Sequence, residues 1–157
     1  MTTWIKRAES MRSEALPQCH GGEGTLDWTQ VVEECEVPRG SLRFIHDDVL
    51  PPGASVGEHK HTDDVEYYVV LAGRGVMVLE GEEHRVETGD VTAVFPGGSH
   101  GLRNDSAQPL RVLVFCIRAS DRNGTEDRQA RTPMRCAGEG TGCDPPARVS
   151  RRSSTPD

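Results

Sequence analysis

The sequence contains no long apolar run and no concentration of positive charge. None of its apolar stretches approaches the roughly 18–20 residues that a membrane-spanning helix needs, and the first residues, MTTWIKRAESMRSEAL, lack the apolar segment of a secretory signal. The formal net charge of −7 and the isoelectric point near 5.4 argue against the basic surface that nucleic acids and anionic membranes require. We therefore expect a cytoplasmic protein that binds neither nucleic acid nor membranes, and whose partners are small molecules or proteins.

Paired cysteines are also missing. The five cysteines are scattered and include no Cys-x-x-Cys pair: Cys19, Cys35, Cys116, Cys136 and Cys143. A disulfide framework and a cysteine zinc site both need closely patterned cysteines, so we expect neither. Lysine is scarce as well, since only Lys6 and Lys60 stand beside sixteen arginines. This ratio of arginine to lysine indicates a GC-rich coding bias and says little about how the protein works.

Short β-prone runs separated by glycine or proline dominate the chain from Val31 onward. The runs that we expect to be strands are 28–37, 41–46, 65–71, 74–80, 83–87, 90–95, 101–104 and 110–118. Many short strands with regular turns indicate an all-β sandwich or barrel, because antiparallel sheets must pair or curl to bury their apolar face. Both faces of 76–79 and 112–115 are apolar, so we expect these two strands to be central.

At 157 residues the chain is long enough for one ordinary domain. Residues 4–16 fit either a short helix or a lead-in strand, and we assign 1–24 to an N-terminal lead-in segment. Residues 25–119 are expected to form the barrel. Residues 120–157 contain almost no aliphatic side chains, so they cannot bury enough apolar surface to offset the entropy lost on ordering. We expect a disordered polar tail there.

Three good metal ligands fall within eight residues of a predicted strand pair. His59 and His61 are two apart, so on a strand their imidazoles share one face, and Glu66 follows on the next strand. His100 supplies a third imidazole after a Pro-Gly-Gly turn. Three histidines and one carboxylate suit one divalent ion of Mn, Fe, Co, Ni, Zn or Cu and leave positions open for water, oxygen or substrate. For His20, in a glycine-rich stretch, a surface loop histidine is the favoured interpretation.

The chain resembles the cupin superfamily in two motifs. The first, G-x5-H-x-H-x4-E-x6-G, is matched at each defined position by Gly53, His59, His61, Glu66 and Gly73. The second, G-x5-P-x-G-x2-H-x3-N, is matched by Gly89, Gly97, His100 and Asn104, with Phe95 in place of the usual proline and Pro96 one position later. The spacing from glycine to histidine is intact, so we expect the turn to survive.

The resemblance covers about residues 40–118 and implies a small, single-domain, type 2-like cupin. Its fold would be a jelly-roll β-barrel of two facing antiparallel sheets, with a metal ion at the mouth held by His59, His61, Glu66 and His100. The motif glycines would hold turns that side chains would strain. Barrels with exposed sheet edges commonly dimerise by sheet pairing, so by analogy we expect a homodimer.

The resemblance leaves the reaction open, because metal-containing cupins share a site more than a chemistry. One hypothesis is an oxygenase, lyase or isomerase that acts on a small carboxylate or carbonyl substrate through metal Lewis-acid or oxygen chemistry. Tyr68 and His46 are its candidate catalytic residues, and Arg43 and Arg103 are its candidate substrate anchors. Core packing is the favoured interpretation of Tyr68, and surface charge that of the arginines. The alternative is a non-catalytic module that binds a small molecule or a metal.

Overall fold

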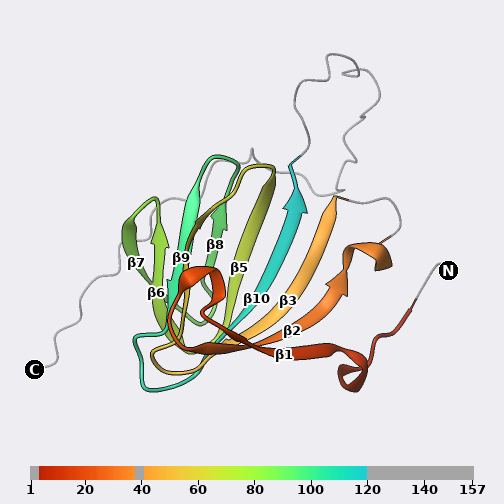
Figure 1. Cartoon of the computed structure of the whole chain (residues 1–157), viewed down its shortest axis with the longest axis horizontal. Coiled ribbons are helices and arrows are strands. Elements are labelled where there is room, and N and C mark those ends of the chain that lie inside the picture. Colours follow the sequence, from red (N-terminus) through yellow and green to blue (C-terminus); the bar gives the residue numbers. More distant parts are fainter. Residues whose placement is uncertain (1–3, 38–40, 120–157) are drawn as a thin grey trace, which may run out of the picture. The chain divides into compact units, whose positions relative to one another are not determined.

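The structure, a computed structural model, describes residues 4–37 and 41–119. In these residues every regular element is a β-strand or a short 3₁₀ turn, and the strands form two antiparallel sheets (Figure 1). The prediction of an all-β chain with two antiparallel sheets is confirmed. No helix in this part of the chain is long and apolar enough to cross a membrane. The expected tail, 120–157, lies outside the described residues, and Cys136 and Cys143 lie there with it.

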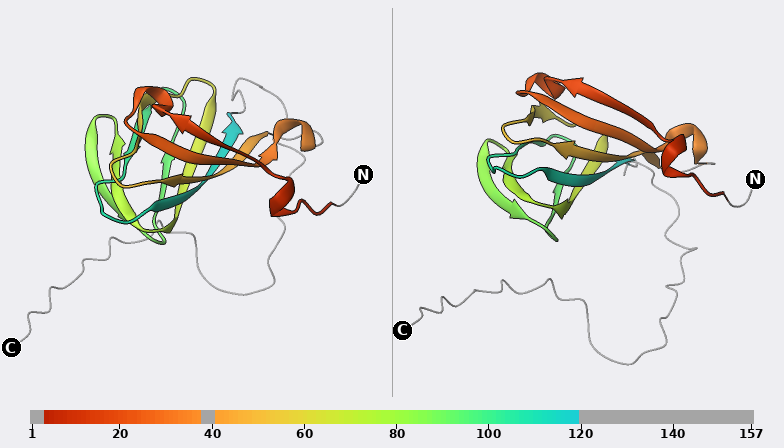
Figure 2. Two further views of the ribbon diagram at one scale, coloured as in Figure 1. Left: turned by 60° about the horizontal axis from the view of Figure 1, so that its bottom comes forward. Right: turned by 90° about the horizontal axis from the view of Figure 1, so that it is seen from below.

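The larger sheet has six strands, in the order β1 (Arg12–Pro17), β2 (Thr25–Glu33), β3 (Leu42–Leu50), β10 (Leu110–Arg118), β5 (Asp64–Ala72) and β8 (Val91–Val94). The smaller sheet has four, in the order β4 (Ser55–Lys60), β9 (Ser99–Arg103), β6 (Arg74–Leu79) and β7 (Glu82–Glu87). The 3₁₀ turns of the described residues are η1 (Ala8–Ser10), η2 (Cys19–Gly21) and η3 (Glu34–Glu36). As expected, β6 and β10 each lie between two other strands. Figure 2 shows the sheets curving around a shared interior.

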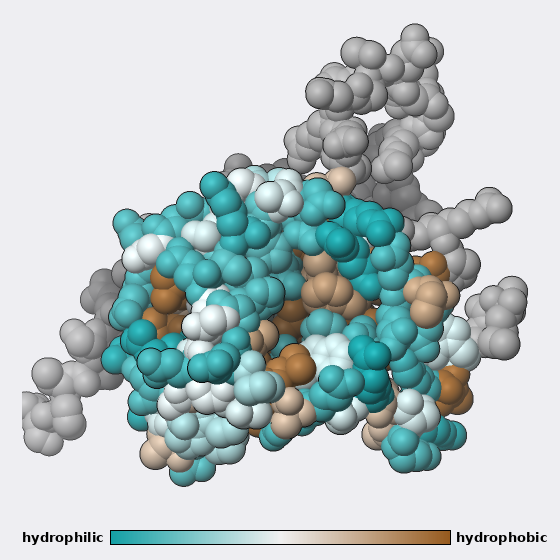
Figure 3. Space-filling view, in the orientation of Figure 1, coloured by the Kyte–Doolittle hydropathy of each residue, from teal (hydrophilic) through white to brown (hydrophobic). Residues whose placement is uncertain are grey.

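Alternating apolar residues build the core between the sheets. In β2, for example, Leu26, Trp28 and Val32 are buried, whereas the residues between them are exposed or half-buried, apart from the buried Gln30. The buried cluster takes residues from both sheets: Leu26, Trp28, Leu50, Ala54, Val56, Tyr68, Val70, Met77, Val86, Leu102, Leu110, Val112 and Val114. In the space-filling view, apolar side chains show through a hollow in a largely hydrophilic face (Figure 3). β2 therefore gives one face to the interior.

Glycines hold the turns that frame the two motifs. Gly53, Gly73 and Gly89 have φ angles of 81°, 86° and 95°, a left-handed region that side chains rarely adopt. At Gly73 there is also no room, because a Cβ would lie 2.4 Å from the carbonyl oxygen of Pro109. The expectation that these glycines hold turns that side chains would strain is confirmed.

Some strand boundaries differ from the predicted ones. Residues 4–16 were expected to form either a short helix or a lead-in strand. The strand is correct from Arg12 onward, where β1 pairs with β2. The strand expected over 28–37 ends at Glu33, because Glu33 and Glu36 form a reciprocal capping box that starts η3. The division of the chain at residues 24 and 119 stays a prediction.

Candidate metal centre

Four side chains from neighbouring strands converge at one place. His59 lies on β4, His61 directly after it, Glu66 on β5 and His100 on β9. Each offers one ligand atom, and the four atoms lie within 4.8 Å of one another. His59 is half-buried and the other three are buried. The fold thus brings together the four residues that the motifs select, and this cluster could hold a metal ion.

Strand pairing explains the convergence. His59 and His100 are direct partners between β4 and β9, so their side chains share a face. The end of β4 is tied to the turn before β9, because the Gly97 N–H donates to the carbonyl oxygen of His61 at 2.8 Å. Gly97 has a φ angle of 95°. The turn therefore survives with Phe95 in the motif's proline position, as expected.

Hydrogen bonds decide which ring nitrogen carries the proton in two of the imidazoles. His59 Nδ1 lies 2.9 Å from the carbonyl oxygen of Gly57, and His61 Nδ1 lies 2.6 Å from Asp64 Oδ1. Both oxygens accept, so the proton is on Nδ1 in each ring. The Nε2 lone pairs of His59 and His61 are then free to coordinate an ion.

The distances between the ligand atoms fit a cation. His61 Nε2 is 3.3 Å from His59 Nε2 and 3.1 Å from His100 Nε2. Glu66 Oε2 is 3.1 Å from His100 Nε2 and 3.6 Å from His61 Nε2. His59 and His61 direct Nε2 lone pairs here and Glu66 directs a carboxylate, so one cation can be shared by all four ligand atoms. A donor set of three imidazoles and one carboxylate suits divalent transition metals.

Asp64 supports the cluster and was not identified from the sequence. It accepts from His61, makes an ion pair with Arg43 and accepts from Cys116 Sγ at 3.4 Å. Burial acts to raise the pKa of Asp64, but the hydrogen bonds from His61 and Cys116 and the charge of Arg43 together lower it. The carboxylate therefore stays ionised and holds the His61 ring. Arg43, a predicted substrate anchor, is engaged in this ion pair.

His20 reaches the cluster from the N-terminal part of the chain. It is exposed in η2, with a φ angle of 51°, and its ring stacks on the His59 ring with centroids 3.8 Å apart and 9° between the planes. Gly57 permits the approach, since a Cβ there would lie 2.3 Å from the carbonyl oxygen of His20. Partial burial lowers the pKa of both imidazoles. The interpretation of His20 as a surface loop residue is right about its exposure and misses this stacking, which no local sequence signal marks.

The two candidate catalytic residues both lie on the inner face of the larger sheet. Tyr68 is 5% exposed and meets the His100 ring edge to face, with centroids 5.0 Å apart. Burial, followed by the negative charge of Glu66, raises its pKa well above the usual tyrosine value. His46 stacks on Phe44 at 4.0 Å instead, and burial lowers its pKa to about 4. Tyr68 thus borders the four-residue cluster, while His46 is a neutral imidazole farther along the sheet.

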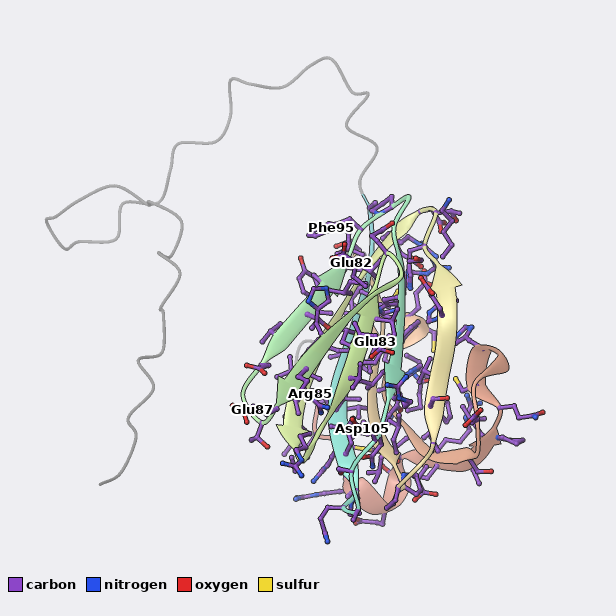
Figure 4. All side chains as sticks on the ribbon, turned by 90° about the vertical axis from the view of Figure 1, so that its left-hand side faces the viewer. Glu82, Glu83, Arg85, Glu87, Phe95 and Asp105 are labelled. Atoms are coloured by element: carbon purple, nitrogen blue, oxygen red, sulfur yellow. The ribbon has the colours of Figure 1, made fainter. Side chains whose placement is uncertain are left out.

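Arg103, the other predicted substrate anchor, is not brought to the cluster. It lies three positions after His100 on β9, so alternation places it on the opposite face. There it makes an ion pair with Glu83 at 3.2 Å, and Arg85 pairs with Asp105 at the same distance. Figure 4 looks onto this side of the smaller sheet, where Glu83, Arg85 and Asp105 are labelled. The sequence predicted that the Arg103 guanidinium could bind an anionic substrate. It did not predict that this side chain lies on the outer face.

Comparison with known proteins agrees with the two motifs. A family model described as "Cupin domain" matches residues 47–116. The "Oxalate-binding protein" of Thermotoga maritima is 30% identical to the chain over 116 residues, which cover 74% of this chain and 95% of that protein. The chain belongs to the cupin family.

Solved structures resemble this cupin in fold. A Thermotoga maritima crystal structure, described as a predicted oxalate decarboxylase, matches with a TM-score of 0.70 and 28% identity, and the match covers 74% of this cupin and 100% of that chain. KdgF from Halomonas sp. matches with a TM-score of 0.58 and 18% identity, covering 76% of this cupin and 98% of that chain. The second likeness supports the fold alone.

Proposed function

We propose that this cupin holds one divalent transition-metal ion at His59, His61, Glu66 and His100 and binds a small carboxylate there. The observation that carries the proposal is the convergence of three imidazoles and one carboxylate within 4.8 Å. A site with these four ligands leaves coordination positions open. When bound, the ion would supply the positive charge that neutralises and orients a carboxylate.

The Thermotoga maritima matches support an oxalate-type ligand. One is named as an oxalate-binding protein and the other is described as a predicted oxalate decarboxylase. A dicarboxylate of the size of oxalate could occupy two open positions with two of its four oxygens. We therefore propose a small dicarboxylate as the ligand class.

The residues around the four ligands would orient them. Asp64 and the Gly57 carbonyl hold the rings of His61 and His59, and His20 covers one face of His59. Tyr68 keeps its proton at neutral pH because its pKa is raised, so its hydroxyl can donate a hydrogen bond. This proton beside His100 favours a second candidate function, an enzyme of the lyase, oxygenase or isomerase type in which Tyr68 donates to the substrate.

Calorimetric titration with oxalate tests the proposal. Full-length protein loaded with Mn²⁺ and protein stripped with a chelator would be compared, with acetate as the single-carboxylate control. We expect oxalate to bind the loaded protein more tightly than acetate does and not to bind the stripped protein. Equal binding before and after stripping would refute the metal-dependent site. Formate and carbon dioxide, assayed in the same samples, separate turnover from binding alone. Cytoplasmic location and a homodimer stay predictions.

A further inference from the structure

Polar side chains cross the inner face of the larger sheet beside the four-ligand cluster. The strand register places Gln30, His46, Val114, Tyr68 and Thr92 in one row across β2, β3, β10, β5 and β8. Asp48 lies in the next row, between Trp28 of β2 and Val112 of β10. This interior is therefore not purely apolar. Asp48 lies two positions after His46 on β3, so the two side chains share the inner face of the sheet.

Asp48 is buried without a complete set of partners. It is 6% exposed, and among the described residues its Oδ1 has no hydrogen-bond partner. The other buried side-chain oxygen without a partner in this part of the chain is Thr92 Oγ1, on the same inner face. Buried polar atoms are almost always hydrogen-bonded, because losing water without replacement is costly. Both atoms therefore leave hydrogen-bonding capacity unused inside the barrel.

Other buried polar side chains of the same interior are satisfied. Gln30 Nε2 donates to the carbonyl oxygen of Val32 at 2.7 Å. Asn104 Nδ2 donates to the carbonyl oxygens of Leu50 and Gln108, both at 2.8 Å. These side chains hydrogen-bond backbone carbonyl groups, which gives their burial a structural reason. Asp48 Oδ1 has no such contact among residues 4–37 and 41–119.

The groups around Asp48 connect it to the cluster. Those with an electrostatic effect on Asp48, or affected by it, are Asp47 on β3, Glu66 and Tyr68 on β5, and Cys19 in η2. His46 shares the inner face of β3 with Asp48. The strand partners of Asp48, Trp28 and Val112, carry no charge.

Burial first, then the negative charges of Glu66 and Asp47, raises the pKa of Asp48 to about 7. The same carboxyl contributes to the raised pKa of Tyr68, so Tyr68 is electrostatically coupled both to Asp48 and to the metal ligand Glu66.

We propose that the Asp48 carboxyl hydrogen-bonds the end of a small dicarboxylate that points away from the four-ligand cluster, and so decides which anions this interior accepts. The inference rests on the proposed function, because the cluster must hold the other end. In its acid form Asp48 donates a proton to a ligand oxygen. In its ionised form it repels the anion, so binding weakens as pH rises through the range in which Asp48 ionises.

Two substitutions of Asp48 test this role in the full-length, Mn²⁺-loaded protein. Asp48→Asn keeps the shape and a donor but cannot ionise, and Asp48→Leu removes both polar atoms. Asp47→Asn is the matched control, because Asp47 is the next residue and pairs with Arg111 at 2.6 and 2.8 Å. Oxalate affinity would be measured by calorimetry at about pH 5 and about pH 8.5, a range wide enough to include the ionisation of Asp48 after a bound cation has lowered its pKa.

We expect the parent protein to lose about tenfold or more in oxalate affinity between the two pH values, since the fraction of Asp48 in its acid form falls. Asp48→Asn should bind oxalate at both. Asp48→Leu should bind about tenfold more weakly than the parent at the lower pH, having lost a hydrogen bond to a charged group. Asp47→Asn should still show a pH dependence, displaced toward lower pH, because the Asp47 charge contributes to the raised pKa of Asp48.

The inference is overturned if Asp48→Asn retains the parent's pH dependence, or if Asp48→Leu binds oxalate as the parent does. Should Asp48→Leu fail to fold, the comparison of Asp48→Asn with the parent still decides. Manganese content is measured in every sample. A parent protein that holds no Mn²⁺ would overturn the proposed function and this inference together. Loaded variants that all bind oxalate alike would overturn the role of Asp48 alone.

Discussion

Asp64 orients His61 through the 2.6 Å contact with its Nδ1 while pairing with Arg43. We expect Asp64→Ala to lower the affinity for Mn²⁺ about ten- to a hundredfold, because such outer partners fix the ring and raise its basicity. Competition with a chelating dye measures this affinity. Asp63→Ala is the control, since Asp63 is the neighbouring carboxylate, is exposed, and its side chain contacts Arg43 and Thr62 at 3.4 Å. Equal losses in the two variants would show that Asp64 has no special role.

His20 covers the His59 ring in a parallel stack at 3.8 Å. We expect His20→Ala to lower metal affinity about three- to tenfold, the equivalent of an aromatic stack of about 0.5–1.5 kcal/mol. His20→Phe, which keeps a flat ring, should retain most of the affinity. The electron paramagnetic resonance spectrum of Cu²⁺-loaded protein provides a second measurement, because it reports ligand geometry. A loss of the same size in both variants would contradict a stacking role and indicate direct coordination by His20.

At the scale of single residues, the sequence predicted the members of the cluster that lie close together in the chain or follow a recognisable turn. His59, His61 and Glu66 lie close in the chain, and His100 follows a turn with a recognisable pattern. The stacking of His20 on His59 and the burial of Asp48 were not predicted, because they depend on which strands and turns meet in space. Arg103 shows the converse, since a suitable residue type near the motif lies on the outer face of β9.

Among the elements, the turns impose the sharpest sequence requirements. Gly53 and Gly73 have nearly the same φ angle, 81° and 86°, but a Cβ on Gly53 would meet nothing within 4 Å, whereas on Gly73 it would meet the Pro109 carbonyl oxygen at 2.4 Å. We expect Gly53→Ala to cost about 1 kcal/mol of unfolding free energy and Gly73→Ala about 2 kcal/mol or more. Urea denaturation measures both. Equal losses of unfolding free energy in the two variants would mean that the structure relieves the close contact at position 73 without cost.

Strand prediction succeeded where apolar alternation was strong and failed where it was weak. β10 has buried residues at every second position, and its limits match the prediction. β4, with the sequence SVGEHK, buries only Val56, and it is absent from the predicted runs although the paired histidines imply a strand. Its position comes from pairing with β9, a long-range contact that periodicity does not encode.

For the whole molecule, apolar side chains remain exposed beside β8, the last strand of the larger sheet. Leu71, Val91 and Phe95 are 39%, 59% and 58% exposed, and Phe95 is labelled in Figure 4. An open edge with apolar neighbours favours pairing with another chain. We expect light scattering after size exclusion to give twice the chain mass of 17.2 kDa.

A single charge should then separate the two copies. Phe95→Glu is expected to return the mass to that of one chain, whereas Ile5→Glu, which alters a side chain that is 78% exposed elsewhere, should leave the dimer intact. A parent protein that already has the mass of one chain would refute the homodimer. A dimer unaffected by Phe95→Glu would exclude this edge as the interface.

The central claim is that this cupin carries one metal ion on four residues, and metal stoichiometry tests it most directly. Full-length protein purified without chelator and then offered Mn²⁺, Fe²⁺, Ni²⁺ or Zn²⁺ would be assayed by mass spectrometry of the metal. Protein with both His59→Ala and His61→Ala, and protein with His84→Ala on exposed β7, would be assayed alongside. We predict about one ion per chain in the parent and in His84→Ala, and none in the folded double variant. A parent that holds no ion under any of these conditions, or a double variant that holds as much as the parent, would contradict the claim.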